Sequence, residues 1–302
     1  MKNKNEKMIF GLYGNLSKKE VVTFAVDFIS HLTSKGSDFI VHDKLAKLIS
    51  KSSNLRFKKN QSVSLKKLIL KSKIIVACGG DGTILSIANA IGKKETPILG
   101  INLGKLGFLT ESSTSNAIEL LDEILLHNYR VESRTMIEVN LNRKKYFGLN
   151  DVVVDKGSSS RVVSILALIN NSALMNFIGD GILVATPTGT TGYSLATGGP
   201  IVSPSSEVFA VSPICAHTLT TRSLVVPDES VITIHAKSEM EKIRLTIDGQ
   251  QKVLLTSPLK IKIRKANHVT NLIKRIDSNY YDVLRKKLLW SNDARAKEIN
   301  EK

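Results

Sequence analysis

The most informative short motif is the run from Gly79 to Thr83, with the sequence GGDGT, which follows an apolar stretch and precedes a helical pattern. Consecutive glycines leave backbone N–H groups accessible, and a helix that starts here adds partial positive charge. Together these features make an anion site suited to phosphates. The run is not a Walker A loop, because it lacks the Lys, and its glycine spacing differs from G-x-G-x-x-G.

Asp81 lies inside this turn, where its carboxylate would repel phosphate unless it has another task. It could accept a proton from an attacking hydroxyl, or help to hold Mg²⁺. It could equally be a helix N-cap, because Asp is among the favoured capping residues. The turn by itself leaves both interpretations open.

A second segment, from Asp180 to Pro200, combines a predicted strand with a dense run of Thr, Gly and Ser and one aromatic side chain. Hydroxyls, backbone donors and an aromatic face in a small volume suit a nucleotide. A long surface loop is the plain alternative, but loops this rich in Thr and Gly are typical of binding elements. A hydrolase is not favoured, because Gly192–Ala196 lacks the last Gly of G-x-S-x-G and Ser194 lies well past the strand end.

The pair Asn150–Asp151 precedes the apolar run from Val152 to Val154. Such a pair at a strand start can bind vicinal hydroxyls. It is also typical of an Asx turn, and on the dipeptide alone the turn is the simpler interpretation.

The glycine turn lies within alternating strand-like and helix-like segments. We expect strands at 8–13, 74–78 and 97–101 and helices at 17–34, 83–91 and 117–126. We expect Ser17 to cap the first helix with Glu20 as its capping-box partner, and Gly36 to end it. This alternation predicts a Rossmann-like α/β domain with a parallel sheet.

After about residue 131 the pattern changes to short alternating segments separated by Gly, Asn and Ser, which predicts a mainly-β domain. The segment 280–290 returns to helical spacing, and we expect this C-terminal helix to return to the first domain. We therefore assign residues 1–130 and 270–302 to an α/β domain carrying the GGDGT turn, and 131–269 to an all-β domain.

Composition excludes several classes of function. The 302 residues carry a net charge of +16, but no finger, RNP1 or G-x-x-G motif accompanies the basic residues, so we expect no nucleic-acid partner. No apolar run approaches the ~20 residues that span a bilayer, and the stretch after Met1–Lys7 is too short for a signal peptide. We expect a cytoplasmic protein that binds no membrane, with both cysteines, Cys78 and Cys215, in the core.

These motifs together resemble the NAD kinase family. That family has a GGDGT turn, then an Asn–Glu pair before a strand, then a T-P-T-G-[ST]-T-x-Y-S-L-x-x-G-G-P segment, in the order found here between about Ile74 and Gly249. The turn alone also resembles diacylglycerol and sphingosine kinases and, more distantly, 6-phosphofructokinase. The segment from Thr186 to Pro200 separates this chain from those relatives.

The resemblance implies phosphorylation of the adenosine-ribose 2′-hydroxyl of NAD, and a role for each matching residue. Asp81 is the catalytic base or orienter of that hydroxyl, and residues 131–269 form the NAD-binding domain. The residues expected to bind phosphates are Gly79, Gly80, Gly82 and Thr83. Those expected to bind NAD are Asn150, Asp151, Asp180, Thr188, Thr191, Tyr193 and Ser194.

The resemblance also implies Mg²⁺ or another divalent cation with ATP, no metal site made by the protein alone, polyphosphate as a possible donor in place of ATP, and a homodimer or homotetramer. Asp151 stands where the family usually has Glu, so its contact with ribose could run through water. The element around His217 also departs from the family pattern, so we assign that residue no catalytic role. A lipid kinase sharing the glycine turn and a non-catalytic dinucleotide-binding module are the alternatives.

Overall fold

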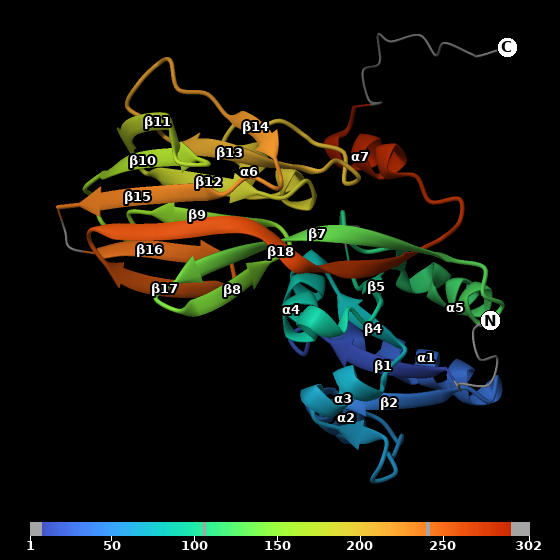
Figure 1. The fold of residues 1–302 in the computed structure, drawn as a ribbon. Helices are drawn as coiled ribbons and strands as arrows, with labels where there is room; N and C mark the ends of the chain where they lie inside the picture. The colour runs from blue at the N-terminus through green and yellow to red at the C-terminus, as the bar shows by residue number, and fades with distance from the viewer. Residues whose placement is uncertain (1–7, 105–106, 240–241, 291–302) are drawn as a thin grey trace, which may run out of the picture. The chain divides into compact units, whose positions relative to one another are not determined.

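The structure is a computed structural model that describes residues 8–104, 107–239 and 242–290. Met1–Lys7, which bear on the signal-peptide prediction, lie outside the described residues. The chain divides into two compact units (Figure 1). Unit 1 comprises Met1–Ile84, Ile98–Glu132 and Leu272–Lys302, and unit 2 comprises Leu85–Pro97 and Ser133–Asn271.

Unit 1 is built on a parallel sheet. Strands β5 (Ile98–Asn102), β4 (Ile74–Gly79), β1 (Ile9–Gly14), β2 (Asp38–His42) and β3 (Ser62–Val63) follow one another across it in that order. The short strand β6 (Ser112–Ser113) and the end of β18 (Leu259–Lys274) pair with β5. Every residue of β4 is buried, as expected for a parallel strand covered on both faces.

The helices of unit 1 that pack on this sheet are α1 (Glu20–Ser34), α2 (Asp43–Ser52), α3 (Leu65–Lys71) and α5 (Ala117–Leu125). The 3₁₀ turn η2 (Thr114–Asn116) and the C-terminal helix α7 (Tyr280–Leu288) also belong to this unit. Phe24, Phe28 and Leu32 recur at helical spacing along α1 and pack with Phe10 and Leu12 of β1 in one buried cluster. Helix α4 (Asp81–Ile91) begins in unit 1, directly after β4.

The capping prediction for the first helix is wrong. Helix α1 starts at Glu20 with Lys19 as N-cap and has no side-chain capping bond. The N–H and the Oγ of Ser17 instead both donate to Oδ1 of Asn15, at 3.0 and 2.8 Å. An Asn side chain that accepts from the residue two positions on forms an Asx turn, and this turn takes Ser17 away from the helix end. The predicted stop is confirmed, because α1 ends at Ser34 and Gly36 has φ +66°.

Unit 2 is a sandwich of two antiparallel sheets (Figure 1). One sheet contains β11 (Ser172–Gly179), β10 (Val163–Ile169), β15 (Ile232–Ser238) and β18, with β7 (Arg130–Leu141) and β8 (Lys144–Gly148) beside β18. The other has the order β14 (Leu224–Pro227), β13 (Val208–Ile214), β12 (Gly181–Ala185), β9 (Asp151–Asp155), β16 (Lys242–Ile247) and β17 (Gln251–Thr256).

Alternating inward side chains of the two sheets form one buried core. Ile165 and Ile234 of the first sheet cluster with Val154, Ile182 and Leu245 of the second. The 3₁₀ turn η1 (Gly92–Lys94) also belongs to this unit. The predicted fold class, an α/β domain with a parallel sheet followed by a mainly-β domain and a C-terminal helix, is confirmed.

Two predictions about single residues have different outcomes. Cys78 lies in the core of unit 1, where burial raises the pKa of its thiol to about 12. Cys215 is exposed, at a backbone φ of +46°, so its assignment to the core is wrong. It follows β13 at a turn, and nothing in the sequence around it indicates that left-handed conformation.

Candidate functional site

The glycine turn lies between β4 and α4, at the carboxyl edge of the parallel sheet of unit 1. The carbonyl of Gly80 accepts from the N–H groups of Thr83 and Ile84, at 2.9 and 3.4 Å, and so starts the helix. A Cβ atom on Gly80 would meet nothing within 4 Å, whereas one on Gly79 would lie 2.1 Å from Oγ1 of Thr83. Open space beside a helix N-terminus is where an anion can approach backbone donors.

Neighbouring loops close around this edge, because β1, β4 and β5 are parallel and their carboxyl ends coincide. The N–H of Asn15 donates to the carbonyl of Cys78 at 2.9 Å, and that of Leu103 to Gly79 at 3.1 Å. Nζ of Lys18 lies 4.0 Å from the position that a Cβ atom on Gly104 would take. Lys18 therefore adds a positive charge that the GGDGT motif does not contain.

Asp81 holds the turn that follows β5. Its Oδ2 accepts from the N–H of Phe108 at 2.8 Å, and its Oδ1 accepts from Leu109 at 3.0 Å. The residue is the first of α4 rather than its N-cap. Each carboxylate oxygen keeps a second lone pair that a hydroxyl could use. The capping interpretation is therefore replaced by a fixed acceptor in the first turn of the helix.

A cavity of about 430 Å³ lies in unit 2, over the sheet that contains β9, β16 and β17. Three of the predicted NAD residues, Asn150, Asp151 and Tyr193, line it. The other lining residues are Val153, Asp155, Arg244, Thr246, Asp248, Gly249 and Lys252. The cavity is therefore lined by three carboxyl groups and two cations, and the local sequence motifs contain only one of these five groups, Asp151.

Asp151 and Asp248 both line this cavity, and Oδ1 of Asp248 accepts from the N–H of Asp151 at 3.1 Å. Both are almost fully buried, with 5% and 9% of their surfaces exposed. Burial, and secondarily the charge of Asp248, raises the pKa of the Asp151 carboxyl to about 7. Burial also raises the pKa of Asp248, although three backbone N–H donors oppose that shift. Asp151 is thus poised to change its charge near neutral pH.

An ion pair also lines the cavity. Arg244 donates from Nε and Nη2 to the two carboxylate oxygens of Asp155, each at 2.9 Å. This two-pronged contact fixes both side chains and holds the pKa of the guanidinium above its usual value. Burial, followed by the charge of Asp155, raises the pKa of the Tyr193 phenol. Tyr193 therefore presents a protonated hydroxyl and an aromatic face.

The segment from Thr186 to Pro200 is not a surface loop. It forms the 3₁₀ turn η3 (Thr188–Thr191) and the short helix α6 (Tyr193–Ala196). Thr186, Thr190 and Ser194 are fully buried. Oγ1 of Thr186 donates to the carbonyl of Leu149 at 2.5 Å, so the segment supports the loop that carries Asn150. Its Thr-rich composition thus serves internal hydrogen bonds, a use that composition alone does not reveal.

The remaining predicted NAD residues lie outside the lining of this cavity. Thr188 and Ser194 are buried, and Thr191 donates to the carbonyl of Thr188 at 3.2 Å. Asp180 precedes β12, is about one-third exposed, and pairs with Lys156 at 2.7 Å. The structure thus brings Asn150, Asp151 and Tyr193 together, while the roles of these other residues stay predictions.

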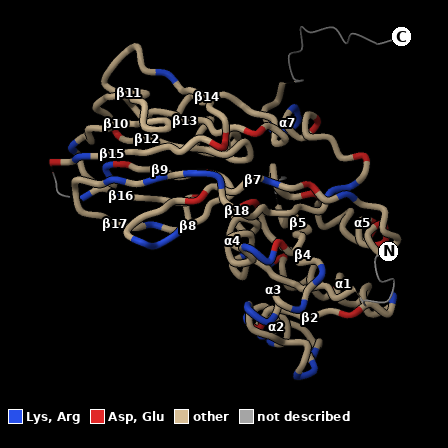
Figure 2. Tube along the Cα trace, in the orientation of Figure 1, with Lys and Arg blue, Asp and Glu red and all other residues tan. Residues whose placement is uncertain are grey.

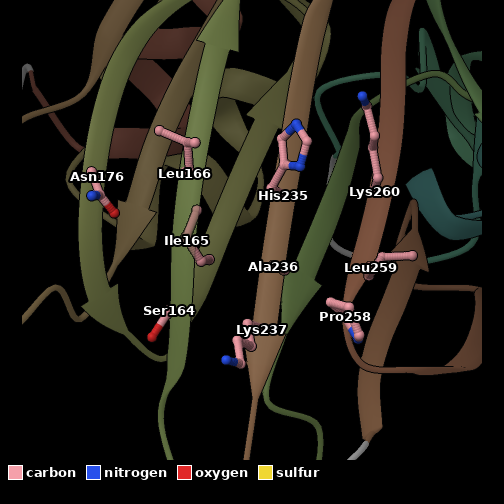
Figure 3. Close-up of a pocket in the computed structure, with 10 residues that line it drawn as sticks. All are labelled: Ser164, Ile165, Leu166, Asn176, His235, Ala236, Lys237, Pro258, Leu259 and Lys260. Carbon is pink, nitrogen blue, oxygen red and sulfur yellow. The ribbon is translucent and has the colours of Figure 1, made fainter.

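A second cavity, of about 300 Å³, lies on the opposite sheet of unit 2, across β11, β10, β15 and β18 (Figure 3). Its lining includes the basic or titratable side chains His235, Lys237 and Lys260 and the apolar residues Leu166 and Pro258. It contains no predicted site residue and no carboxyl group. Lys and Arg elsewhere lie on many elements of both units (Figure 2), which is typical of a solvated basic surface.

In the ranges 8–104, 107–239 and 242–290, no three His, Cys, Asp or Glu side chains are grouped so that they could hold a metal ion. None of the helices in those ranges combines the length and the apolar character that crossing a membrane requires.

Comparison with known proteins identifies a family for both parts of the chain. The ATP-NAD kinase N-terminal domain model matches residues 10–129, and the ATP-NAD kinase C-terminal domain model matches 149–275. The NAD kinase of Caldanaerobacter subterraneus subsp. tengcongensis is 38% identical over 283 residues, which cover 92% of this chain and 98% of that protein. The NAD kinase of Chloroherpeton thalassium is 34% identical over 290 residues, 95% and 99% of the two chains.

Two solved structures share the fold. Yeast NADH kinase complexed with NADH superposes with a TM-score of 0.84 at 24% identity, covering 99% of this chain and 91% of that one. An NAD kinase from Archaeoglobus fulgidus in complex with ATP superposes with a TM-score of 0.74 at 22% identity, covering 93% and 99%.

Proposed function

This chain belongs to the NAD kinase family, and on that premise we propose which of its residues carry out the reaction. The enzyme is a transferase that phosphorylates NAD at the expense of ATP. The family match leaves the lipid kinase and the non-catalytic binding module without support. The observation that carries the residue assignment is the fixed carboxylate of Asp81 beside the open glycine turn.

We propose that Gly79, Gly80, Gly82 and Thr83 bind the phosphates of ATP. The space beside Gly80 supports this assignment, because a phosphate can approach the start of α4 without displacing protein atoms. Lys18 supplies a cation near the same edge. Phosphoryl transfer depends mainly on positioning and charge neutralisation, and this edge offers both.

Asp81 then orients the attacking 2′-hydroxyl. The ribose oxygen bonds to the γ-phosphorus, the bond from that phosphorus to the β–γ bridging oxygen breaks, and ADP leaves. The hydroxyl proton passes to the carboxylate of Asp81 as the new bond forms. Because both oxygens already accept backbone N–H groups, the carboxylate is fixed in direction, which favours orientation over strong basicity.

A divalent cation, Mg²⁺ for example, accompanies ATP in this proposal. It neutralises charge on the phosphates when bound. Mg²⁺ is commonly held by one or two carboxylates together with substrate phosphates. Asp81 fits that arrangement, because it lies in the glycine turn and each of its carboxylate oxygens accepts only one backbone N–H and keeps a second lone pair.

NAD occupies the cavity of unit 2 in our proposal, with Asn150 and Asp151 on the adenosine part. Oδ1 of Asn150 is buried and has no hydrogen-bond partner within the described parts of the chain, so it can accept from a ligand. Tyr193 offers its ring as a wall. Asp180 remains the candidate for binding the nicotinamide half of NAD. Thr188 and Ser194 are buried, and we propose that they support the cavity wall from behind. Thr191 does not line the cavity, and its contact with NAD stays a prediction.

A homodimer or homotetramer, a cytoplasmic location and polyphosphate as an alternative donor remain proposals. Two apolar side chains of the edge strand β14, Leu224 and Val225, are about two-fifths exposed, which supports the proposed oligomer. Sedimentation of the purified enzyme tests this, and a monomer at assay concentration would contradict it.

The role of Asp81 is tested by Asp81→Asn, measured for kcat and for the KM of each substrate. We expect kcat to fall on the order of 10²-fold or more, with the KM for NAD changed much less. Turnover close to that of the unaltered enzyme would remove Asp81 from the chemistry.

A further inference from the structure

Asp248 occupies the turn between β16 and β17, directly behind the Asn150–Asp151 pair. Its carboxylate accepts three backbone N–H groups: Oδ2 from Leu149 at 2.8 Å, and Oδ1 from Asn150 at 2.8 Å and Asp151 at 3.1 Å. Its own N–H donates to the carbonyl of Asp151 at 3.0 Å. Four hydrogen bonds thus join one residue of a hairpin turn to three consecutive residues before and within β9.

The backbone around Asp248 is shaped for this contact. Asp248 has φ +52° and Gly249 has φ +66°, so the hairpin turn carries two successive left-handed residues, which Asn, Asp and Gly tolerate best. Gly148 leaves room for the carboxylate, because a Cβ atom there would lie 2.9 Å from Oδ1 of Asp248. The carboxylate is therefore enclosed and directed toward the backbone that presents Asn150 and Asp151.

We propose that Asp248 is a positioning residue for NAD, which holds the side chains of Asn150 and Asp151 in the geometry that binds the dinucleotide. This inference rests on the proposed NAD site in the same cavity. Bonds from N–H groups to an ionised carboxylate are roughly twice as strong as neutral ones. An amide in its place keeps only one acceptor oxygen and turns an NH₂ group toward N–H donors, so the loop loses its anchor.

A dependence of NAD binding on pH follows from the same arrangement. The hairpin turn brings the carboxylate of Asp248 to the backbone N–H of Asp151, at 3.1 Å. The other charged or titratable groups lining the cavity are Asp155 on β9, Arg244 on β16, Lys252 on β17 and Tyr193 on α6.

With the pKa of Asp151 at about 7, its carboxyl is mostly protonated below that pH and mostly ionised above it. The ionised form accepts ribose hydroxyl hydrogens, so the apparent affinity for NAD rises as the pH rises through about 7. Loss of the Asp248 charge lowers the pKa of Asp151 and moves that inflection to lower pH.

The test is Asp248→Asn, because Asn tolerates the left-handed backbone and so isolates the carboxylate. Equilibrium binding of NAD by calorimetry across a pH series is measured beside the KM for NAD, the KM for ATP and kcat. We expect the Kd for NAD to weaken on the order of tenfold, the KM for ATP to stay within about twofold, and the pH inflection to move down.

The matched control is Asp228→Asn, which also removes a buried carboxylate of unit 2, one that pairs with Lys265 at 2.7 Å. Equal effects of the two variants on the Kd for NAD, or an unmoved inflection in Asp248→Asn, would overturn the inference. If Asp248→Asn does not fold, Gly148→Ala, which pushes on Oδ1 of Asp248, must weaken NAD binding for the inference to stand.

Binding measurements on Asn150→Ala distinguish a wrong location for the NAD site from a wrong role for Asp248. If NAD binds elsewhere, Asn150→Ala leaves the Kd for NAD unchanged. If only the role of Asp248 is wrong, Asn150→Ala weakens NAD binding while Asp248→Asn behaves like Asp228→Asn.

Discussion

Gly107 lies directly against the carboxylate of Asp81: a Cβ atom on the glycine would lie 1.9 Å from Oδ1 of the aspartate. The two residues are separated by a helix and a strand in sequence, yet the carboxylate bonds to the backbone immediately after Gly107. The direction in which Asp81 points is therefore set by the turn after β5, and small changes in that turn should disturb the reaction.

Gly107→Ala tests this dependence. The added methyl must displace the Asp81 carboxylate or the turn, so we expect kcat to fall on the order of 10²-fold, as in Asp81→Asn. Thermal unfolding of the variant checks that unit 1 still folds. Activity within a few fold of the unaltered enzyme would show that the direction of the carboxylate is unimportant.

Gly80→Ala distinguishes phosphate binding from folding. A methyl here meets nothing within 4 Å, so we expect thermal stability to be unchanged or slightly raised. The same methyl fills space that a phosphate would use, so the KM for ATP should rise on the order of tenfold or more. Steady-state kinetics at saturating NAD measures it, and an unchanged KM for ATP would place the phosphates elsewhere.

Gly189→Ala tests whether the segment from Thr186 to Pro200 holds the loop that carries Asn150 in place. Its Cβ would lie 2.0 Å from the carbonyl oxygen of Asn150, a backbone atom that cannot move independently. We expect a loss of about 1–3 kcal/mol in unfolding free energy and a raised KM for NAD. Gly192→Ala is the control for the unfolding free energy, since its Cβ would meet nothing closer than 3.2 Å. Equal effects from the two changes would count against the support role.

Asp151→Asn should change the dependence of stability on pH. The pKa of Asp151 is raised from 3.8 to about 7 in the folded protein, so folding binds a proton and the free energy of unfolding falls as the pH rises from about 4 to about 7. Asn carries no such penalty. The unfolding free energy of the variant, measured relative to that of the unaltered protein, should therefore rise by on the order of a few kcal/mol as the pH rises from about 4 to about 7.

Urea unfolding at a series of pH values measures this difference. A difference in unfolding free energy that does not change between acid and neutral pH would contradict the raised pKa of Asp151. The same series on Asp228→Asn shows how much of any change belongs to buried carboxylates in general.

The elements that carry strong periodicity could be predicted from sequence. The apolar run ending at Cys78 is β4, and the helical spacing after Ser17 is α1, although the capping residue was wrong. Strand β2 (Asp38–His42) was missed because it is short and bounded by polar residues. Its identity is decided by parallel pairing with β1 rather than by its own composition.

The candidate site was predicted only where a motif marks it. Asp81 and Asn150 stand in recognisable motifs, whereas the partners that fix them do not. Asp248 binds backbone about one hundred residues away, and such a contact leaves no local pattern. The dipeptide Asp248–Gly249 is a hairpin-turn signal. It could have indicated the turn, but not that the carboxylate accepts hydrogen bonds from the backbone of residues 149–151.

The most direct test of the account is formation of NADP by the purified enzyme. It is incubated with NAD, ATP and Mg²⁺, and the product is detected with an NADP-specific dehydrogenase, with Asp81→Asn and an ATP-free reaction in parallel. We predict NADP that requires ATP and falls on the order of 10²-fold in the variant. Folded protein that forms no NADP with ATP or polyphosphate would contradict the account.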